Sequence, residues 1–202
     1  MKDHFKKRNV GIFIFNQVEV LDFAGPFEVF SVCSELHNEE FFNVFTLARD
    51  LQPVDTVNGL SVNPKYSLDS GPKIDILIIA GGAGTRTLIE DTEVMTKLNE
   101  LIQKSEFALS ICSGARILGK LGYLDNQEFT THHGVYDHMK EVAPLARPRP
   151  DKRYLDNGKI LTSGGISAGI DLSFFIIEKL LGNKIKQTTA DYMEYCLEEN
   201  VY

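Results

Sequence analysis

The chain has 202 residues, of which 43% are hydrophobic and 24% charged, a composition typical of one globular domain with a full core. Its formal net charge of −7 argues against a broad nucleic-acid-binding surface. Three widely spaced cysteines, none in a C-x-x-C pair, argue against a disulfide framework and a zinc site. No apolar stretch reaches the length of a membrane span, and the first residues lack a signal-peptide core. We therefore predict one domain over 1–202, cytoplasmic, without a membrane or nucleic-acid partner.

Strand and helix patterns alternate along the first half of the chain. The run 10–15 is almost wholly apolar, as expected of a parallel strand covered on both faces. A helix is predicted within 22–36, with Pro26 in its first turn, where the missing N–H costs little. A second strand is predicted over 41–47. An Asn-Gly pair between apolar segments predicts a hairpin over 54–62.

The second half continues the alternation. The run 74–79 is the most strand-like in the chain and leads directly into Gly81 and Gly82. The patterns that follow predict a helix over 91–104, a strand over 107–111, a helix after Cys112, a short strand over 129–131, a helix over 135–142, a stiff loop over 147–150, a hairpin over 153–162, and helices over 168–181 and about 185–198. This order predicts an α/β three-layer sandwich, with a central, mainly parallel sheet and helices on both faces.

The stretch around Cys112 is the strongest candidate for chemistry. An apolar strand breaks directly into a helix there, and Gly114 permits the sharp turn of a nucleophile elbow. A cysteine at the start of a helix meets partial positive charge and free N–H groups, which favour a thiolate. The alternative is that Cys112 is a small buried hydrophobic residue, the usual role of a free cysteine.

Asp22 and the glycine pair fall at the same edge of the predicted sheet, where the carboxyl ends of parallel strands form ligand sites. Asp22 is either a helix cap or a carboxyl group that exchanges a proton with Cys112. Gly81 and Gly82 are either an ordinary tight turn or a place where a backbone N–H, paired with one just after Cys112, forms an oxyanion hole. They match no phosphate-binding motif.

Three further polar residues are candidates. His132 and His133 are adjacent, so at most one is expected to face the site and assist nucleophilic attack; otherwise both are polar loop residues. Their spacing does not suit a metal, and we predict no metal and no cofactor. Ser113 either offers its hydroxyl to a substrate or caps the helix.

Four segments, taken together and in this order, resemble the ThiJ/PfpI superfamily, which has the class I glutamine amidotransferase-like fold. They are Val20–Pro26, Ile79–Thr85, Ser110–Ala115 and Thr162–Asp171. The first and last look most like the isocyanide hydratase subgroup and the sensor domains of AraC-type regulators. Those regulators carry a C-terminal helix-turn-helix region, for which this chain leaves no room after Tyr202.

The resemblance implies a role for each candidate. Cys112 matches the reactive cysteine, and Asp22 the acidic residue that contacts it in the hydratases. Gly82 and Ser113 match positions whose N–H groups line an anion pocket, and His132 matches a histidine near the cysteine in several branches. The hydratases usually have Thr where this chain has Ser113, which keeps the hydroxyl but loses a methyl group.

The leading interpretation is a cysteine-dependent enzyme that acts on a small electrophilic molecule. An isocyanide hydratase-like reaction would convert an isocyanide into an N-substituted formamide through a thioimidate on Cys112. The alternatives are an amidase, a glyoxalase-type hydratase of 2-oxoaldehydes, or a non-enzymatic redox or ligand sensor that uses the same cysteine. The resemblance also implies a homodimer.

Overall fold

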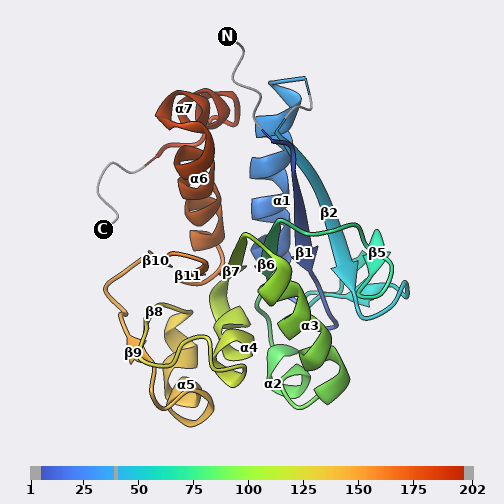
Figure 1. The fold of residues 1–202 in the computed structure, drawn as a ribbon, viewed down its shortest axis with the longest axis vertical. Coiled ribbons are helices and arrows are strands. Elements are labelled where there is room, and N and C mark those ends of the chain that lie inside the picture. Colours follow the sequence, from blue (N-terminus) through green and yellow to red (C-terminus); the bar gives the residue numbers. More distant parts are fainter. Residues whose placement is uncertain (1–5, 39–40, 198–202) are drawn as a thin grey trace.

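In the computed structural model, which describes residues 6–38 and 41–197, a seven-stranded sheet forms the centre of the molecule (Figure 1). The strand order is β10 (Tyr154–Asn157), β11 (Ile160–Ser163), β7 (Phe107–Ser110), β6 (Ile76–Ile79), β1 (Arg8–Phe13), β2 (Phe42–Ala48) and β5 (Tyr66–Ser67). All neighbours are parallel except β10 and β11, which form an antiparallel hairpin. Every residue of β6 is buried, because helices cover both of its faces.

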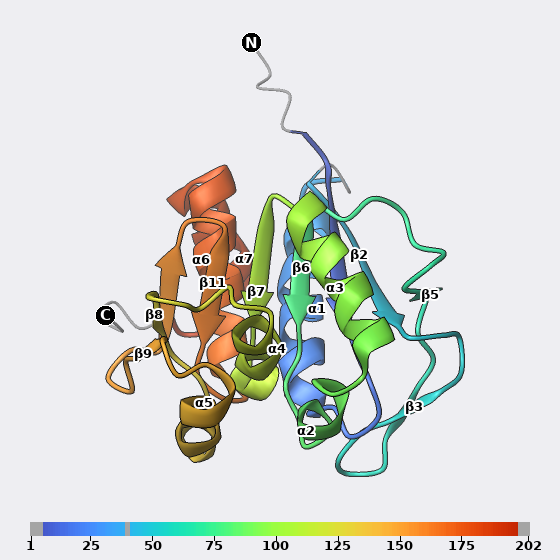
Figure 2. The same ribbon diagram turned by 60° about the horizontal axis from the view of Figure 1, so that its bottom comes forward.

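Helices form the outer two layers, as the alternating pattern predicts (Figure 2). On one face lie α1 (Val20–Glu35), α6 (Ala168–Leu181) and α7 (Asn183–Tyr192), which contact one another. The opposite face carries α3 (Thr92–Lys104) and α4 (Ala115–Lys120). Two short helices, α2 (Thr85–Leu88) and α5 (Tyr136–Val142), lie with α4 towards the carboxyl ends of the parallel strands. The predicted three-layer α/β sandwich is therefore confirmed.

Short strands connect these layers. The predicted Asn-Gly hairpin is present as β3 (Val54–Asp55) and β4 (Ser61–Val62), with Gly59 at φ +83° in the turn. A second small sheet pairs β8 (Glu128–Phe129) with β9 (Arg147–Pro148). The prediction of a loop over 147–150 is therefore wrong at its first two residues. Pro148 is tolerated there because an edge strand leaves its missing N–H without a required partner.

Two helix boundaries also differ from the prediction. α1 begins at Val20, so Pro26 lies inside the helix rather than in its first turn. Pro26 cannot donate to the carbonyl group of Asp22 four residues earlier, and that helical bond is lost. α7 ends at Tyr192 rather than near residue 198, which itself lies outside the described residues.

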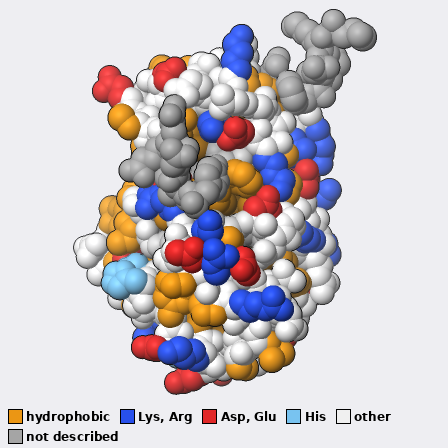
Figure 3. All heavy atoms as spheres, turned by 90° about the vertical axis from the view of Figure 1, so that its left-hand side faces the viewer, with side chains coloured by type: hydrophobic (Ala, Val, Ile, Leu, Met, Phe, Trp, Pro, Cys, Tyr) orange, Lys and Arg blue, Asp and Glu red, His pale blue; other side chains and the backbone are white. Residues whose placement is uncertain are grey.

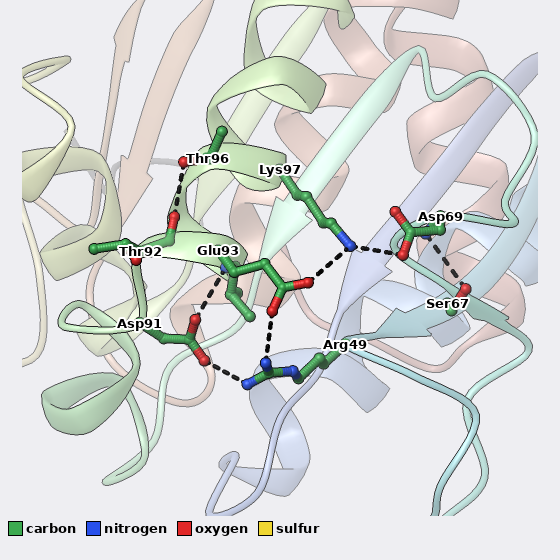
Figure 4. Close-up of polar contacts among 9 residues, drawn as sticks. Arg49, Ser67, Asp69, Asp91, Thr92, Glu93, Thr96 and Lys97 are labelled. Atoms are coloured by element: carbon green, nitrogen blue, oxygen red, sulfur yellow. Dashed lines mark hydrogen bonds and ion pairs between the residues drawn. The ribbon is translucent and has the colours of Figure 1, made fainter.

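A network of ion pairs links α3 to the loops that follow β2 and β5 (Figure 4). The Arg49 guanidinium donates to Asp91 at 2.6 Å and to Glu93 at 2.7 Å, and Lys97 donates to Asp69 at 2.6 Å. Asp91 also caps α3 by accepting a hydrogen bond from the Val94 N–H. These groups are largely exposed, so each pair stabilises the fold by only about 0–1 kcal/mol.

The surface is mixed rather than uniformly charged. On the face shown in Figure 3, Lys and Arg side chains alternate with Asp, Glu and hydrophobic side chains. Within the described ranges, no helix is long and apolar enough to cross a membrane.

Candidate active site

The turn after β7 holds Cys112 in a strained conformation. Cys112 has φ +55°, in the left-handed region that non-glycine residues seldom adopt, and it opens a 3₁₀ turn over Cys112–Gly114 that leads into α4. Two hydrogen bonds hold this conformation: the Cys112 N–H donates to the Gly164 carbonyl at 3.1 Å, and the Thr131 hydroxyl donates to the Cys112 carbonyl at 2.6 Å. The sharp turn also needs Gly114, since a Cβ there would lie 2.4 Å from the Ile79 carbonyl oxygen. The structure therefore contains the predicted elbow.

Asp22 lies in the first turn of α1 and is fully buried. Its side chain does not cap the helix, because the cap position is Glu19. Instead, its Oδ2 accepts a hydrogen bond of 3.0 Å from the N–H of Gly81. Its Oδ1 is buried and has no hydrogen bond of standard geometry within the described part of the chain. The carboxyl group also interacts with the Cys112 side chain at the elbow.

Gly81 lies between the two groups. A Cβ on Gly81 would be 2.6 Å from Asp22 Oδ2, 2.6 Å from the Ser113 nitrogen and 2.8 Å from Cys112 Cβ. Any side chain there would therefore push Asp22 and Cys112 apart.

Burial is the largest influence on the pKa of both members of the pair. Burial raises the pKa of the Asp22 carboxyl to about 7, although the Gly81 N–H and the Cys112 side chain both lower it. Burial and the negative charge of Asp22 raise the pKa of the Cys112 thiol to about 12, against the stabilising N–H groups of Ser113 and Ile166. The thiol is therefore protonated at neutral pH. Burial therefore opposes the thiolate that the start of the helix is expected to favour.

The glycine N–H groups do not match the predicted oxyanion hole. The Gly82 N–H donates to the Ser113 hydroxyl at 2.8 Å, and the Gly81 N–H is bonded to Asp22. Both donors therefore have internal acceptors in this structure. The Ser113 hydroxyl also accepts a bond of 3.3 Å from Thr85, so this side chain links the turn after β6 to the elbow. The N–H groups that do act on the sulfur belong to Ser113 and Ile166.

Ile166 was not identified from the sequence as a site residue. Its φ of +53° is left-handed, and its N–H acts on both Asp22 and Cys112. The segment over 162–171 carries part of the family resemblance, but nothing in an isoleucine indicates that its backbone is functional. Only the tertiary placement of the loop after β11 reveals it.

The two adjacent histidines differ in position. His132 is half-buried and lines the same cavity as Cys112, whereas His133 is exposed. His132 Nδ1 accepts a hydrogen bond of 3.1 Å from the Gly134 N–H, and burial together with His133 lowers its pKa. A neutral His132 therefore carries its proton on Nε2. The described residues contain no hydrogen bond between His132 and Cys112 and no cluster of three side chains suited to a metal.

A cavity of about 200 Å³ opens above the thiol and suits a small molecule. It is lined by Glu19, Gly82, Ala83, Arg86, Cys112, Ser113, Arg116, His132, Val135 and Ile166. Arg86 and Arg116 were not identified from the sequence. One feature of the sequence could have indicated Arg116 as a site residue. It lies four residues after Cys112 on the same helical stretch, where a charged residue interrupts an apolar face.

A buried thiol at a strand-to-helix elbow, next to a buried carboxyl group and above a small cavity, defines a cysteine-based site at the carboxyl end of a parallel sheet. A family model for the DJ-1/PfpI family matches residues 8–179. The chain therefore belongs to the DJ-1/PfpI family.

Relatives within this family differ in function. The chain is 29% identical to an isonitrile hydratase of Pseudomonas putida, over 92% of this chain and 78% of that protein. It is 22% identical to the HTH-type transcriptional regulator GbdR of Pseudomonas aeruginosa, over 93% of this chain but only 51% of the regulator. The crystal structure of a ThiJ/PfpI family protein from Pseudomonas syringae superposes with a TM-score of 0.85 at 22% identity, covering 96% of this chain and 78% of that one. That likeness supports the fold.

Proposed function

We propose that this protein is a cysteine-dependent enzyme that hydrates a small isocyanide to an N-substituted formamide. One observation carries the proposal: a buried carboxyl group whose pKa is raised to about 7 adjoins the thiol that faces the cavity. A base with a pKa near neutral can take the thiol proton and return it within one turnover. The 29% identity to an isonitrile hydratase supports this choice of substrate.

The reaction assigns one task to each group. The Cys112 thiol gives its proton to the ionised Asp22 as the sulfur bonds to the terminal isocyanide carbon. Asp22 then gives that proton to the same carbon, which produces a thioimidate on Cys112. Water adds to the thioimidate carbon as Asp22 takes one of its protons and passes it to the nitrogen. The remaining hydroxyl proton then passes through Asp22 to the sulfur as the carbon–sulfur bond breaks, which releases the N-substituted formamide and restores the thiol. The N–H groups of Ser113 and Ile166 stabilise the sulfur whenever it carries negative charge.

The direct test is turnover of a panel of aryl and alkyl isocyanides, with the formamide detected by mass spectrometry. The proposal predicts product with the wild-type protein and none with Cys112→Ala. Methylglyoxal and a simple amide, assayed in parallel, test the glyoxalase-type and amidase alternatives through lactate and ammonia release. No formamide from any isocyanide would contradict the proposal.

A ligand sensor is the second candidate, supported by the similarity to part of GbdR. The chain spans about half the length of that regulator, so its regulatory function is not transferred to this protein. Saturable binding of an isocyanide without any product would favour the sensor. A redox sensor is a weaker candidate, because a thiol with a raised pKa reacts slowly with peroxide.

A further inference from the structure

Arg116 is the one buried arginine of the described chain, and like the exposed Arg86 and Arg147 it forms no ion pair with a described carboxylate. The whole Arg116 residue is only 3% exposed. Arg8, Arg49, Arg149 and Arg153 each form an ion pair with a carboxylate, and Arg49 has two such partners in Figure 4. Among the described residues, no carboxylate lies within ion-pair distance of Arg116. A buried cation without a counter-ion costs several kcal/mol, so the protein retains a substantial unbalanced charge here.

Neutral partners hold the Arg116 guanidinium in place. Its Nε donates to His138 Nδ1 at 2.9 Å, and its Nη1 donates to the Thr85 hydroxyl at 2.8 Å. The positive charges of Arg116 and Arg86, added to burial, lower the pKa of His138, so this acceptor stays neutral. In the part of the chain that the structure describes, Nη2 has no hydrogen-bond partner, and it is not among the fully buried unpaired atoms. It therefore remains available to a ligand.

Arg116 lines the cavity that contains Cys112. Arg116 and Cys112 are four residues apart on one helical stretch, and both line the cavity. The exposed Arg86 lines it too and forms no ion pair with any described residue. Glu19 is the one carboxylate residue among the cavity-lining residues, against these two arginines. A chain with a net charge of −7 thus has a locally cationic pocket around its reactive cysteine.

We propose that the Cys112 cavity takes a small electrophile that carries a carboxylate, held by Arg116 with support from Arg86. The inference rests on the proposed function in taking Cys112 as the reactive centre, but it does not depend on the isocyanide chemistry. A planar guanidinium with a free N–H matches a carboxylate, and binding would supply the counter-ion that Arg116 lacks. The cavity of about 200 Å³ limits the rest of the molecule to a few heavy atoms.

The test compares isocyanoacetate with its neutral ethyl ester. The wild-type protein should prefer the carboxylate in kcat/KM, and Arg116→Gln should lower the carboxylate-to-ester ratio by about 30-fold or more, as expected when a buried charge pair loses one partner. Arg116→Lys should retain part of the preference. Lys120→Gln, on the same helix but outside the cavity, makes the same charge change and should leave the ratio unaltered.

Two further measurements keep the outcome decisive. If Arg116→Gln does not fold, the exposed Arg86→Gln should still lower the ratio by about threefold, a rim-charge effect. Binding of N-formylglycine, measured by calorimetry against its ethyl ester, does not require turnover. If the protein forms product but neither Arg116→Gln nor Arg86→Gln changes the carboxylate-to-ester ratio of kcat/KM, this inference alone is overturned. Arg116-dependent binding of N-formylglycine without turnover of any isocyanide would overturn the proposed function alone.

Discussion

Cys112 and Cys33 are both buried thiols with raised pKa values, yet their surroundings differ in every feature that chemistry needs. Cys33 lies within α1, is fully buried in the core, and has a pKa raised by burial to about 11. Cys112 has a pKa of about 12, but it lies at a strained elbow beside Asp22 and faces a cavity. Burial and pKa therefore do not distinguish the two thiols. A neighbouring buried carboxyl group and an adjoining cavity distinguish them, and the proposed function rests on both.

The largest expected difference between the two thiols is in turnover. Cys112→Ala removes the atom that bonds to the substrate, so kcat for isocyanide hydration should fall by a factor of about 1,000 or more. Cys33→Ala leaves a small core cavity, and it should cost about 1–2 kcal/mol of unfolding free energy while kcat changes less than about twofold. Steady-state kinetics and urea unfolding of both variants measure this. Comparable loss of kcat in the two would remove the distinction.

Gly81→Ala should separate Asp22 from Cys112 without altering either residue. The added Cβ would lie 2.6 Å from Asp22 Oδ2 and from the Ser113 nitrogen, both in a packed environment. A displacement of this kind should lower kcat/KM by about 100-fold. Gly71→Ala is the matched control, because its Cβ would meet nothing closer than 3.6 Å. A Gly81→Ala protein with full activity would mean that the close approach of the two groups is not required.

Asp22→Asn should change how stability depends on pH. The folded-state pKa of Asp22 is about 7, against 3.8 for an unperturbed group, so between these values the folded protein holds a proton that the unfolded chain has lost. This contribution to stability therefore falls as pH rises from about 4 to about 7. Asn is neutral throughout and its carbonyl can still accept from Gly81. The free energy of unfolding of the variant, relative to that of the wild type, should therefore rise by on the order of 3 kcal/mol between about pH 4 and about pH 8.

Urea unfolding at the two pH values measures that difference. Asp137→Asn provides the control, since Asp137 is exposed and its pKa is lowered by Lys140 rather than raised. Its pH dependence should stay close to that of the wild type. A constant difference between Asp22→Asn and the wild type from acid to neutral pH would show that Asp22 ionises as easily in the folded protein as in the unfolded chain.

The smallest expected effect concerns thiol modification. Cys196 is exposed, whereas Cys112 is buried and protonated at neutral pH, so iodoacetamide should label Cys196 faster by about tenfold or more. Peptide mass spectrometry over time gives both rates, and Cys33 should react slowest. Preferential labelling of Cys112 near pH 7 would instead indicate a resting thiolate and would strengthen the redox-sensor alternative.

The layered fold and the position of the elbow were predictable because they depend on local patterns. The apolar run before Cys112 and the glycine after it define a strand that breaks into a helix, whatever the rest of the chain does. The start of α1 was not predictable to the residue, so Pro26 was placed in the wrong turn. Pairing of β9 with β8 joins segments that are separated by α5, and no local signal encodes it.

The site was predictable only where a residue type itself suggests chemistry. Cys112, Asp22 and His132 could be selected on that basis. The resting thiol state could not, because it depends on how deeply Asp22 and Cys112 are buried together. The backbone of Ile166 and the unbalanced charge of Arg116 could not either, since each depends on which distant segments surround it.

The pH dependence of kcat/KM for an isocyanide, measured in the wild type and in Asp22→Asn, tests the central claim most directly. That claim is that Asp22 accepts the proton of the Cys112 thiol. The account predicts that wild-type kcat/KM rises through about pH 7, as Asp22 ionises, and then levels off, because the thiol pKa of about 12 lies beyond the accessible range. Asp22→Asn should have low activity without this inflection. An inflection near pH 7 that persists in Asp22→Asn, or a flat wild-type profile, would contradict it.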